Sequence, residues 1–205
     1  MSELIAFGTL GFQHIVDVNA ADHLLFLLAL GAIYRPRDWR SALLVVSAFT
    51  VGHSITLAAA ALAWVTPPTR WIEFLIPVTI VATGVENLLR RERTANGTAI
   101  GTAARLRPVF ALAFGLVHGA GFATYLRSLL GSATAVPLLG FNLGVEAGQV
   151  VILFTSALGF AALDGALARL PRARSDARLA FQWRLTGVSL AVTTVAAIWA
   201  AQRWP

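Results

Sequence analysis

The fold of this chain is decided near its start by the stretch Gln13-His14-Ile15-Val16-Asp17-Val18-Asn19-Ala20-Ala21-Asp22-His23, which leads directly into an apolar segment at 24–34. Two imidazoles and two carboxylates therefore stand where a run of membrane-compatible side chains begins. Ionisable groups cost kilocalories per mole in hydrocarbon, so a plain membrane anchor would not carry an Asp-His pair at this point. A bound cation that offsets this cost is the natural explanation.

The composition is that of an integral membrane protein. Of the 205 residues, 57% are hydrophobic and 13% are charged, which is far from the usage of soluble domains. The absence of cysteine excludes disulfides, iron–sulfur centres and thiolate metal sites, and the single methionine disfavours Cu⁺ chemistry. All sixteen basic residues are arginines that stand mainly between apolar runs, where they act as topology signals. We therefore expect contact with the lipid bilayer and no nucleic-acid partner.

The apolar runs set the expected number of crossings. About 20 apolar residues in a helix span the hydrocarbon core, and five runs meet this length: 40–65, 71–89, 106–130, 137–163 and 181–204. The run at 24–34 is too short, so we expect it to join 4–16 as one crossing that is broken at 17–21. Such a break is tolerated where the backbone faces protein or a wet cavity.

The sequence therefore predicts an all-α polytopic bundle of six transmembrane helices, the first one broken, in a single transmembrane domain over 1–205. Seven segments result if the N-terminal part crosses by itself. The connections at 35–40, 90–107 and 169–178 carry three, five and four arginines, and they alternate with connections that carry one each. The positive-inside rule then places these three connections in the cytoplasm and both termini outside, in a bacterial inner membrane.

Polar side chains inside the apolar segments form the candidate site. All the histidines fall within or at the edge of such segments, and none lies in an arginine-rich connection. The same segments hold several carboxylates and amides, with Asn142, Glu146 and Gln149 on one helical face. Imidazole and carboxylate ligands without sulfur suit borderline divalent ions, so we expect Ni²⁺, Co²⁺ or Zn²⁺ as substrate or ligand.

Some of these residues also have ordinary structural explanations. A single buried histidine is as often a hydrogen-bonded packing residue as a ligand, which leaves both roles open for His53 and His118. Asp17 is suited to cap a helix. Glu86 stands four residues before Arg90, the spacing of a common helix ion pair.

Asp22, His23 and Glu146 favour a functional role more strongly. Adjacent helical residues point in different directions, so Asp22 and His23 both need partners. Glu146 is a mid-helix carboxylate with no arginine nearby in the sequence. Asp164, near a helix end, is expected to be solvated.

Glycines at small-xxx-small spacings predict close helix packing. The sequence indicates that the helices at 106–130 and 137–163 approach each other through Gly115, Gly119, Gly121, Gly140, Gly144 and Gly148. This packing would hold His118 opposite Glu146.

Five stretches of the sequence, which follow one another in the same order as in a known family, give the chain a family resemblance. They are Gly11-Phe12-Gln13-His14-Ile15 with Asp22-His23-Leu24-Leu25-Phe26, Ala48-Phe49-Thr50-Val51-Gly52-His53-Ser54-Ile55-Thr56-Leu57, Ile72-Glu73-Phe74-Leu75-Ile76-Pro77, Phe114-Gly115-Leu116-Val117-His118-Gly119-Ala120-Gly121-Phe122-Ala123, and Phe141-Asn142-Leu143-Gly144-Val145-Glu146-Ala147-Gly148-Gln149. Over residues 7 to 155 the chain resembles the HupE/UreJ family, regarded as nickel or cobalt permeases associated with hydrogenase and urease maturation.

The resemblance implies a set of metal-handling positions: His14, Asp22, His23, His53, His118 and Glu146, with Asp17, Glu86, Asn142 and Gln149 in supporting roles. His14 precedes Asp22 by two residues more than in the better-known permeases. Two residues turn a helix by about 200°, so His14 and Asp22 share a site only if the chain is broken between them.

The leading interpretation is a membrane permease for a divalent transition-metal cation, and not an enzyme. An intramembrane hydrolase would instead hold Zn²⁺ with an open water position. A haem-binding electron carrier would use His53 and His118 as axial ligands. A purely structural role, as an assembly partner of another membrane complex, is a further alternative. The sequence is also compatible with a homo-oligomer.

Overall fold

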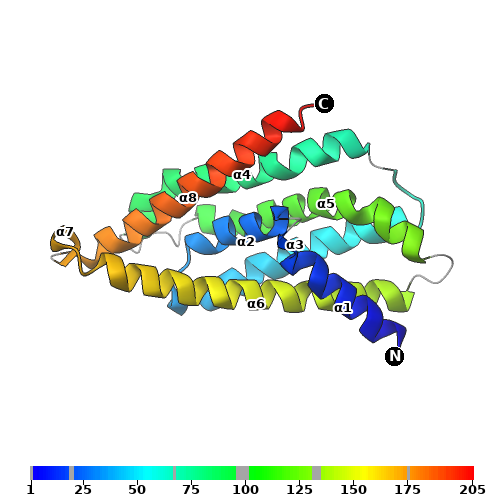
Figure 1. The fold of residues 1–205 in the computed structure, drawn as a ribbon, viewed down its shortest axis with the longest axis horizontal. Helices are drawn as coiled ribbons and strands as arrows, with labels where there is room; N and C mark the ends of the chain where they lie inside the picture. Colours follow the sequence, from blue (N-terminus) through cyan, green and yellow to red (C-terminus); the bar gives the residue numbers. More distant parts are fainter. Residues whose placement is uncertain (1, 19–20, 67, 96–101, 131–134, 175) are drawn as a thin grey trace.

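The computed structural model is a bundle of helices that run roughly along its long axis (Figure 1). It describes residues 2–18, 21–66, 68–95, 102–130, 135–174 and 176–205, and within these ranges there is no strand. The helices are α1 (Glu3–Val16), α2 (Asp22–Ala32), the 3-10 turn η2 (Pro36–Asp38), α3 (Trp39–Ala61), α4 (Thr69–Ala95), α5 (Thr102–Leu130), α6 (Ala135–Leu167), α7 (Pro171–Arg174) and α8 (Ala177–Gln202).

Four of these helices are long and apolar enough to cross a membrane: Pro36–Ala61, Thr69–Arg90, Ala135–Leu167 and Arg178–Gln202. Two shorter apolar helices, Asp22–Ala32 and Leu106–Phe122, accompany them among the described residues. The prediction of an all-α membrane protein is confirmed. Residues 96–101, inside the predicted 90–107 connection, lie outside the described residues.

The first apolar element is interrupted where the sequence indicated. Helix α1 ends at Val16 and α2 begins at Asp22, while residues 19–20 of the break lie outside the described ranges. The two helices follow one another from the end of the molecule that holds the N-terminus toward the end that holds α7 (Figure 1). Asp17 and Val18, the described residues that follow α1, are exposed.

Glycines determine which helices approach each other most closely. A Cβ added at Gly115 of α5 would overlap the backbone of Phe49 in α3, and one at Gly144 of α6 would overlap the backbone of Gly8 in α1. The prediction that the helices at 106–130 and 137–163 pack mainly on each other was wrong. In the described part of the chain, α5 packs on α3 and α6 packs on α1, because each glycine surface receives the backbone of another helix.

A buried ion pair joins α8 to α6 and α2. Arg184 is only 2% exposed, and its Nε donates to Asp164 Oδ1 at 2.7 Å. Its second guanidinium nitrogen donates at 2.7 Å to the carbonyl of Ala32, one of the last-turn carbonyls of α2 that lack a partner within the helix. Asp164 was expected to be solvated; its side chain is 30% exposed, and it also pairs with an arginine inside the apolar run of α8.

The glycine contacts predict a position-specific loss of stability. We expect Gly115→Ala to lower the thermal unfolding temperature in detergent, because overpacking a close contact costs about 1–3 kcal/mol. Gly159→Ala is the matched control, since a Cβ there would meet nothing within 4 Å. Unfolding temperatures are measured by differential scanning fluorimetry. Equal values for the two variants would contradict a contribution of the close α3–α5 contact to stability.

Candidate metal site

Three histidine side chains from three helices meet where α1 ends and α2 begins. One ligand atom each from His14 of α1, His23 of α2 and His53 of α3 can be chosen so that all lie within 4.8 Å of one another. The ring centroids are 4.7 Å apart for His14 and His23, 5.8 Å for His23 and His53, and 6.2 Å for His14 and His53. Atoms that bind one ion tetrahedrally at about 2.1 Å lie roughly 3.4 Å apart, so modest side-chain rotations would bring the three onto one ion.

A fourth imidazole lies against that of His23. His118 of α5 has its ring centroid 5.2 Å from that of His23. The name histidine cluster is used below for His14, His23, His53 and His118, which comprise every histidine of the chain. Phenylalanine rings from α2, α3 and α6 pack around the cluster and limit its contact with water.

The cluster is buried, and most of its nitrogens have no hydrogen-bond partner. His23 is 6% exposed, His53 0% and His118 1%. Within the described residues, no partner is found for Nε2 of His14, Nε2 of His23, either nitrogen of His53 or Nδ1 of His118. Each buried polar group without a hydrogen-bond partner lowers the stability of the fold by about 1–3 kcal/mol. Native proteins therefore rarely leave such a group unpaired. Several unpaired lone pairs in one place fit a cation that the imidazoles ligate.

A threonine of α4 orients the ring of His118. The Thr79 hydroxyl donates to the carbonyl of Ile76 at 2.7 Å. It has one hydrogen, so at 2.9 Å it accepts from His118 Nε2, which then carries the proton. This contact assigns the tautomer that leaves the lone pair on Nδ1, the atom without a partner. Metal-binding histidines commonly have their second nitrogen fixed by such a contact.

An open hollow reaches the cluster at the helix break. It has a volume of about 470 Å³ and is lined by Gln13, His14, Val16, Asp17 and Phe122. Asp17 is exposed there, and a carboxylate beside the opening raises the local concentration of cations. The hollow therefore leaves His14 lining an open space, although the other three histidines are buried.

Asp22 is engaged outside the cluster although it adjoins His23. Arg203, just after the end of α8, places one guanidinium nitrogen 3.1 Å and 3.2 Å from the two carboxylate oxygens of Asp22. The Asp22 side chain is 18% exposed and that of Arg203 is 33% exposed. The contact ties the C-terminal helix to the first turn of α2.

The polar face of α6 meets α3. Glu146 accepts a hydrogen bond from the Ser47 hydroxyl at 2.7 Å, and Gln149 accepts one from the Thr50 hydroxyl at 2.7 Å. The side-chain oxygen of Asn142 is buried and has no partner among the described residues. These groups form a polar seam between α3 and α6.

Glu86 lies in a separate charged group. Its carboxylate is 3.1 Å from Arg90 and 3.6 Å from Arg107. Asn87 beside it donates to the carbonyl of Ala29 at 2.6 Å and accepts from Arg107 at 3.3 Å. Glu86 thus makes the predicted helix ion pair, and its partners here are arginines.

Comparison with known families adds one finding. The pattern of a family described as HupE / UreJ protein matches residues 1–203, essentially the whole chain. The chain belongs to the HupE/UreJ family. No curated protein and no solved structure matches it. HupE/UreJ membership confirms the resemblance read from the sequence and makes this a membrane protein related to nickel and cobalt transport, in a family that is not known for enzymes.

The structure thus brings the predicted histidines together, while the described partners of the predicted carboxylates Asp22, Glu146 and Glu86 are Arg203, Ser47, and Arg90 with Arg107. Sequence reasoning missed Thr79 and the partner of Asp22. A threonine in an apolar run carries no signal of its own. Arg203 was visible as a lone arginine at the end of the last run, but 181 residues separate it from Asp22.

The contact between Thr79 and His118 predicts a change in metal affinity. We expect Thr79→Val to weaken Ni²⁺ binding by about tenfold, because the ring of His118 loses the group that fixes its tautomer. Thr79→Ser should restore binding, and Thr155→Val, whose hydroxyl bonds only within α6, should have no effect. Isothermal titration of the purified protein measures this, and equal affinities for the Val and Ser variants would contradict it.

Proposed function

We propose that this HupE/UreJ protein carries a divalent transition-metal ion across the membrane, with Ni²⁺ and Co²⁺ as the leading substrates. The observation that carries the proposal is the histidine cluster, in which four helices present unpartnered imidazole nitrogens inside an apolar bundle. Family membership supports nickel and cobalt over other ions.

The donor set suits a transported ion. Imidazole binds Ni²⁺, Co²⁺ and Zn²⁺ well, and the chain offers no sulfur ligand that would select Cu⁺. Neutral imidazoles do not cancel the charge of a bound ion, so carboxylate oxygens farther along the route still attract it. Conduction also requires that each site bind the ion weakly enough to release it. We propose that Asp22 and Glu146 supply those oxygens, Asp22 by exchanging the guanidinium of Arg203 for the ion.

Polar groups mark a route on both sides of the cluster. The hollow lined by His14 and Asp17 lies where α1 ends. On α4, Thr79, Thr83 and Asn87 follow one another at spacings of four along one face, and they are 6%, 4% and 0% exposed. This face runs from His118 toward the arginine-rich end, so we propose it as part of the inward path.

The helix arrangement supports the predicted topology. We propose six crossings within one transmembrane domain over 1–205, with α1 and α2 together making the first, in a bacterial inner membrane. The connections at 35–40, 90–107 and 169–178 are then cytoplasmic. The breaking of the first crossing at the histidine cluster agrees with the rule that irregular backbone at membrane depth lines a site.

The geometry gives less support to the alternatives. A haem held between His53 and His118 needs a flat slot between the two rings, yet the His23 ring lies 5.8 Å from one and 5.2 Å from the other. Ser54, the serine nearest His53 in the sequence, donates to the carbonyl of Thr50 at 2.7 Å, so its hydroxyl is engaged within the helix. Transport therefore remains the function that the site supports best.

Uptake into proteoliposomes tests the proposal. We expect His23→Ala to reduce uptake of radioactive Ni²⁺ or Co²⁺ by about tenfold or more, since even indirect partners of a metal site are worth about 10–100-fold. Glu146→Gln should reduce uptake while leaving the Ser47 contact possible. Glu73→Gln is the matched control, because Glu73 is exposed on α4.

Uptake that is unchanged by His23→Ala and Glu146→Gln would count decisively against the proposed route. Thermal unfolding of each variant separates a transport defect from a folding defect.

A further inference from the structure

An aromatic side chain of α5 belongs both to the open hollow at the end of α1 and to the surroundings of the histidine cluster. Phe122 lines the hollow together with His14 and Asp17. Its ring centroid is 4.0 Å from that of His14, and the two ring planes are tilted by 40°. At this separation the rings are in direct contact. Phe122 is therefore the side chain through which another helix meets His14 at the opening.

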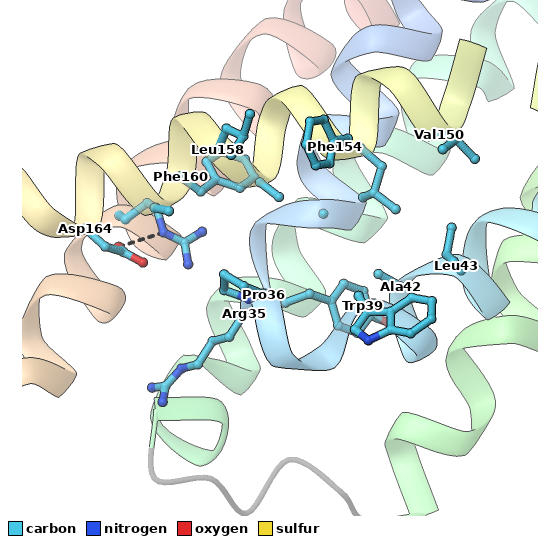
Figure 2. A pocket seen from close by; sticks show the side chains of 16 residues that line it. Arg35, Pro36, Trp39, Ala42, Leu43, Val150, Phe154, Leu158, Phe160 and Asp164 are labelled. Atoms are coloured by element: carbon cyan, nitrogen blue, oxygen red, sulfur yellow. Dashed lines mark hydrogen bonds and ion pairs between the residues drawn. The ribbon is translucent and has the colours of Figure 1, made fainter. Parts of the chain in front are cut away.

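The larger cavity of the bundle leads elsewhere. Figure 2 shows it between α6 and the segment from Arg35 into α3. It has a volume of about 500 Å³, and no histidine is among the residues that line it. Of these two cavities, the hollow at Phe122 is thus the one that touches the histidine cluster.

The hollow touches His14 but leaves its unpartnered nitrogen covered. Nε2 of His14 is buried, and so are Nε2 of His23 and both nitrogens of His53. An ion that enters the hollow therefore comes beside Asp17, while the lone pairs that would ligate it remain shielded. A side chain has to move before the ion can reach them.

The ring behind Phe122 is held in place by packing. Phe122 stacks on Phe141 of α6, with the ring centroids 5.1 Å apart and 13° between the planes. Phe141 is 0% exposed, and its backbone lies so close to Gly11 of α1 that a Cβ added there would overlap it. Phe122 is only partly buried. Of the two rings, Phe122 is the one that can turn without displacing a helix.

The hollow is large enough to receive the turned ring of Phe122. An apolar cavity of about 150 Å³ holds a benzene molecule. The hollow has a volume of about 470 Å³, so the ring can enter it and still leave space for an ion. Side chains at a surface change rotamer rapidly, so this movement requires no rearrangement of the bundle.

We propose that Phe122 is the gate of the histidine cluster: its ring covers the cluster in this structure and turns away to admit an ion from the hollow. The inference rests on the proposed metal function and specifies how access to that site is controlled. The ring is closed both before and after the ion passes. A gate of this kind therefore changes the rates of binding and release by the same factor and leaves the affinity unchanged.

Stopped-flow kinetics with Ni²⁺ test the gate on the purified full-length chain in detergent. A chromophoric chelator that competes for the ion reports both association and release. We expect Phe122→Ala to raise both rate constants by about tenfold, which is the upper value of one contact between aromatic rings, with an unchanged dissociation constant. Phe122→Leu, which keeps an apolar side chain of intermediate size, should give intermediate rates. Phe110→Ala is the matched control, because Phe110 lies on the same helix and is 48% exposed.

Chemical modification of the metal-free protein gives a second measurement that needs no ion. Diethyl pyrocarbonate reacts with accessible neutral imidazoles, and mass spectrometry locates the product. We expect Phe122→Ala to raise the modification rates of His23 and His53, because the ring no longer covers them. Phe110→Ala should leave both rates at the wild-type level.

Rate constants and modification rates that are the same in Phe122→Ala and in the wild type would overturn the gate. So would faster release with unchanged association, since that result assigns Phe122 to holding the bound ion. A wild type that binds no Ni²⁺ would overturn the proposed function itself, whereas a failure of the Phe122 variants alone would leave the metal site standing. Unfolding temperatures identify a misfolded variant, and Phe122→Leu then decides the test.

Discussion

Imidazole nitrogens that lie inside an apolar bundle without hydrogen-bond partners are the constraint on which the rest of this structure depends. Hydrocarbon offers no water to satisfy them, so the surrounding helices must either supply a partner or hold a cation among them. Thr79 supplies one partner, to His118, and one nitrogen each of His14, His23 and His53 lies within 4.8 Å of the other two. The end of α1 and the start of α2 meet beside these nitrogens, which agrees with the interruption of the first apolar element between Val16 and Asp22.

Close backbone packing keeps the histidines in place. Gly119, next to His118, is so near α3 that an added Cβ would overlap the backbone of His53. On the other side, Gly11 of α1 approaches the backbone of Phe141 in α6 in the same way. Two helix pairs, α3 with α5 and α1 with α6, thus fix the backbone positions of His14, His53 and His118. A site built on packed helices holds its geometry better than one built on loops.

Charged residues inside the bundle serve two different purposes. Arg184 has a structural role, because it donates hydrogen bonds to Asp164 and to a last-turn carbonyl of α2. Asp22 is held by Arg203 at a partly exposed contact beside the cluster, where surface ion pairs contribute little stability. The first pair is suited to lock the fold. The second pair is weak, which agrees with the exchange of Arg203 for the ion that is proposed above.

The sequence by itself determined where the helices lie, where the first apolar element is interrupted, and which ligand types are present. Apolar runs of membrane-spanning length predicted the helices, and the short run at 24–34 predicted the interruption. The absence of cysteine left imidazole and carboxylate as ligands. These features are local, because hydropathy and helix length depend on neighbours in the chain. The family likewise followed from short ordered stretches.

Only the tertiary structure decided which helices pair and which charges meet. Glycine spacing shows that a helix can be approached closely, but it does not say by which partner, so the predicted contact between the helices at 106–130 and 137–163 was wrong. The partners of Asp22 and Asp164 lie on α8 or at its end, far along the chain. A carboxylate pairs with the cation that helix packing brings nearest. The separation of two residues along the sequence does not predict that distance.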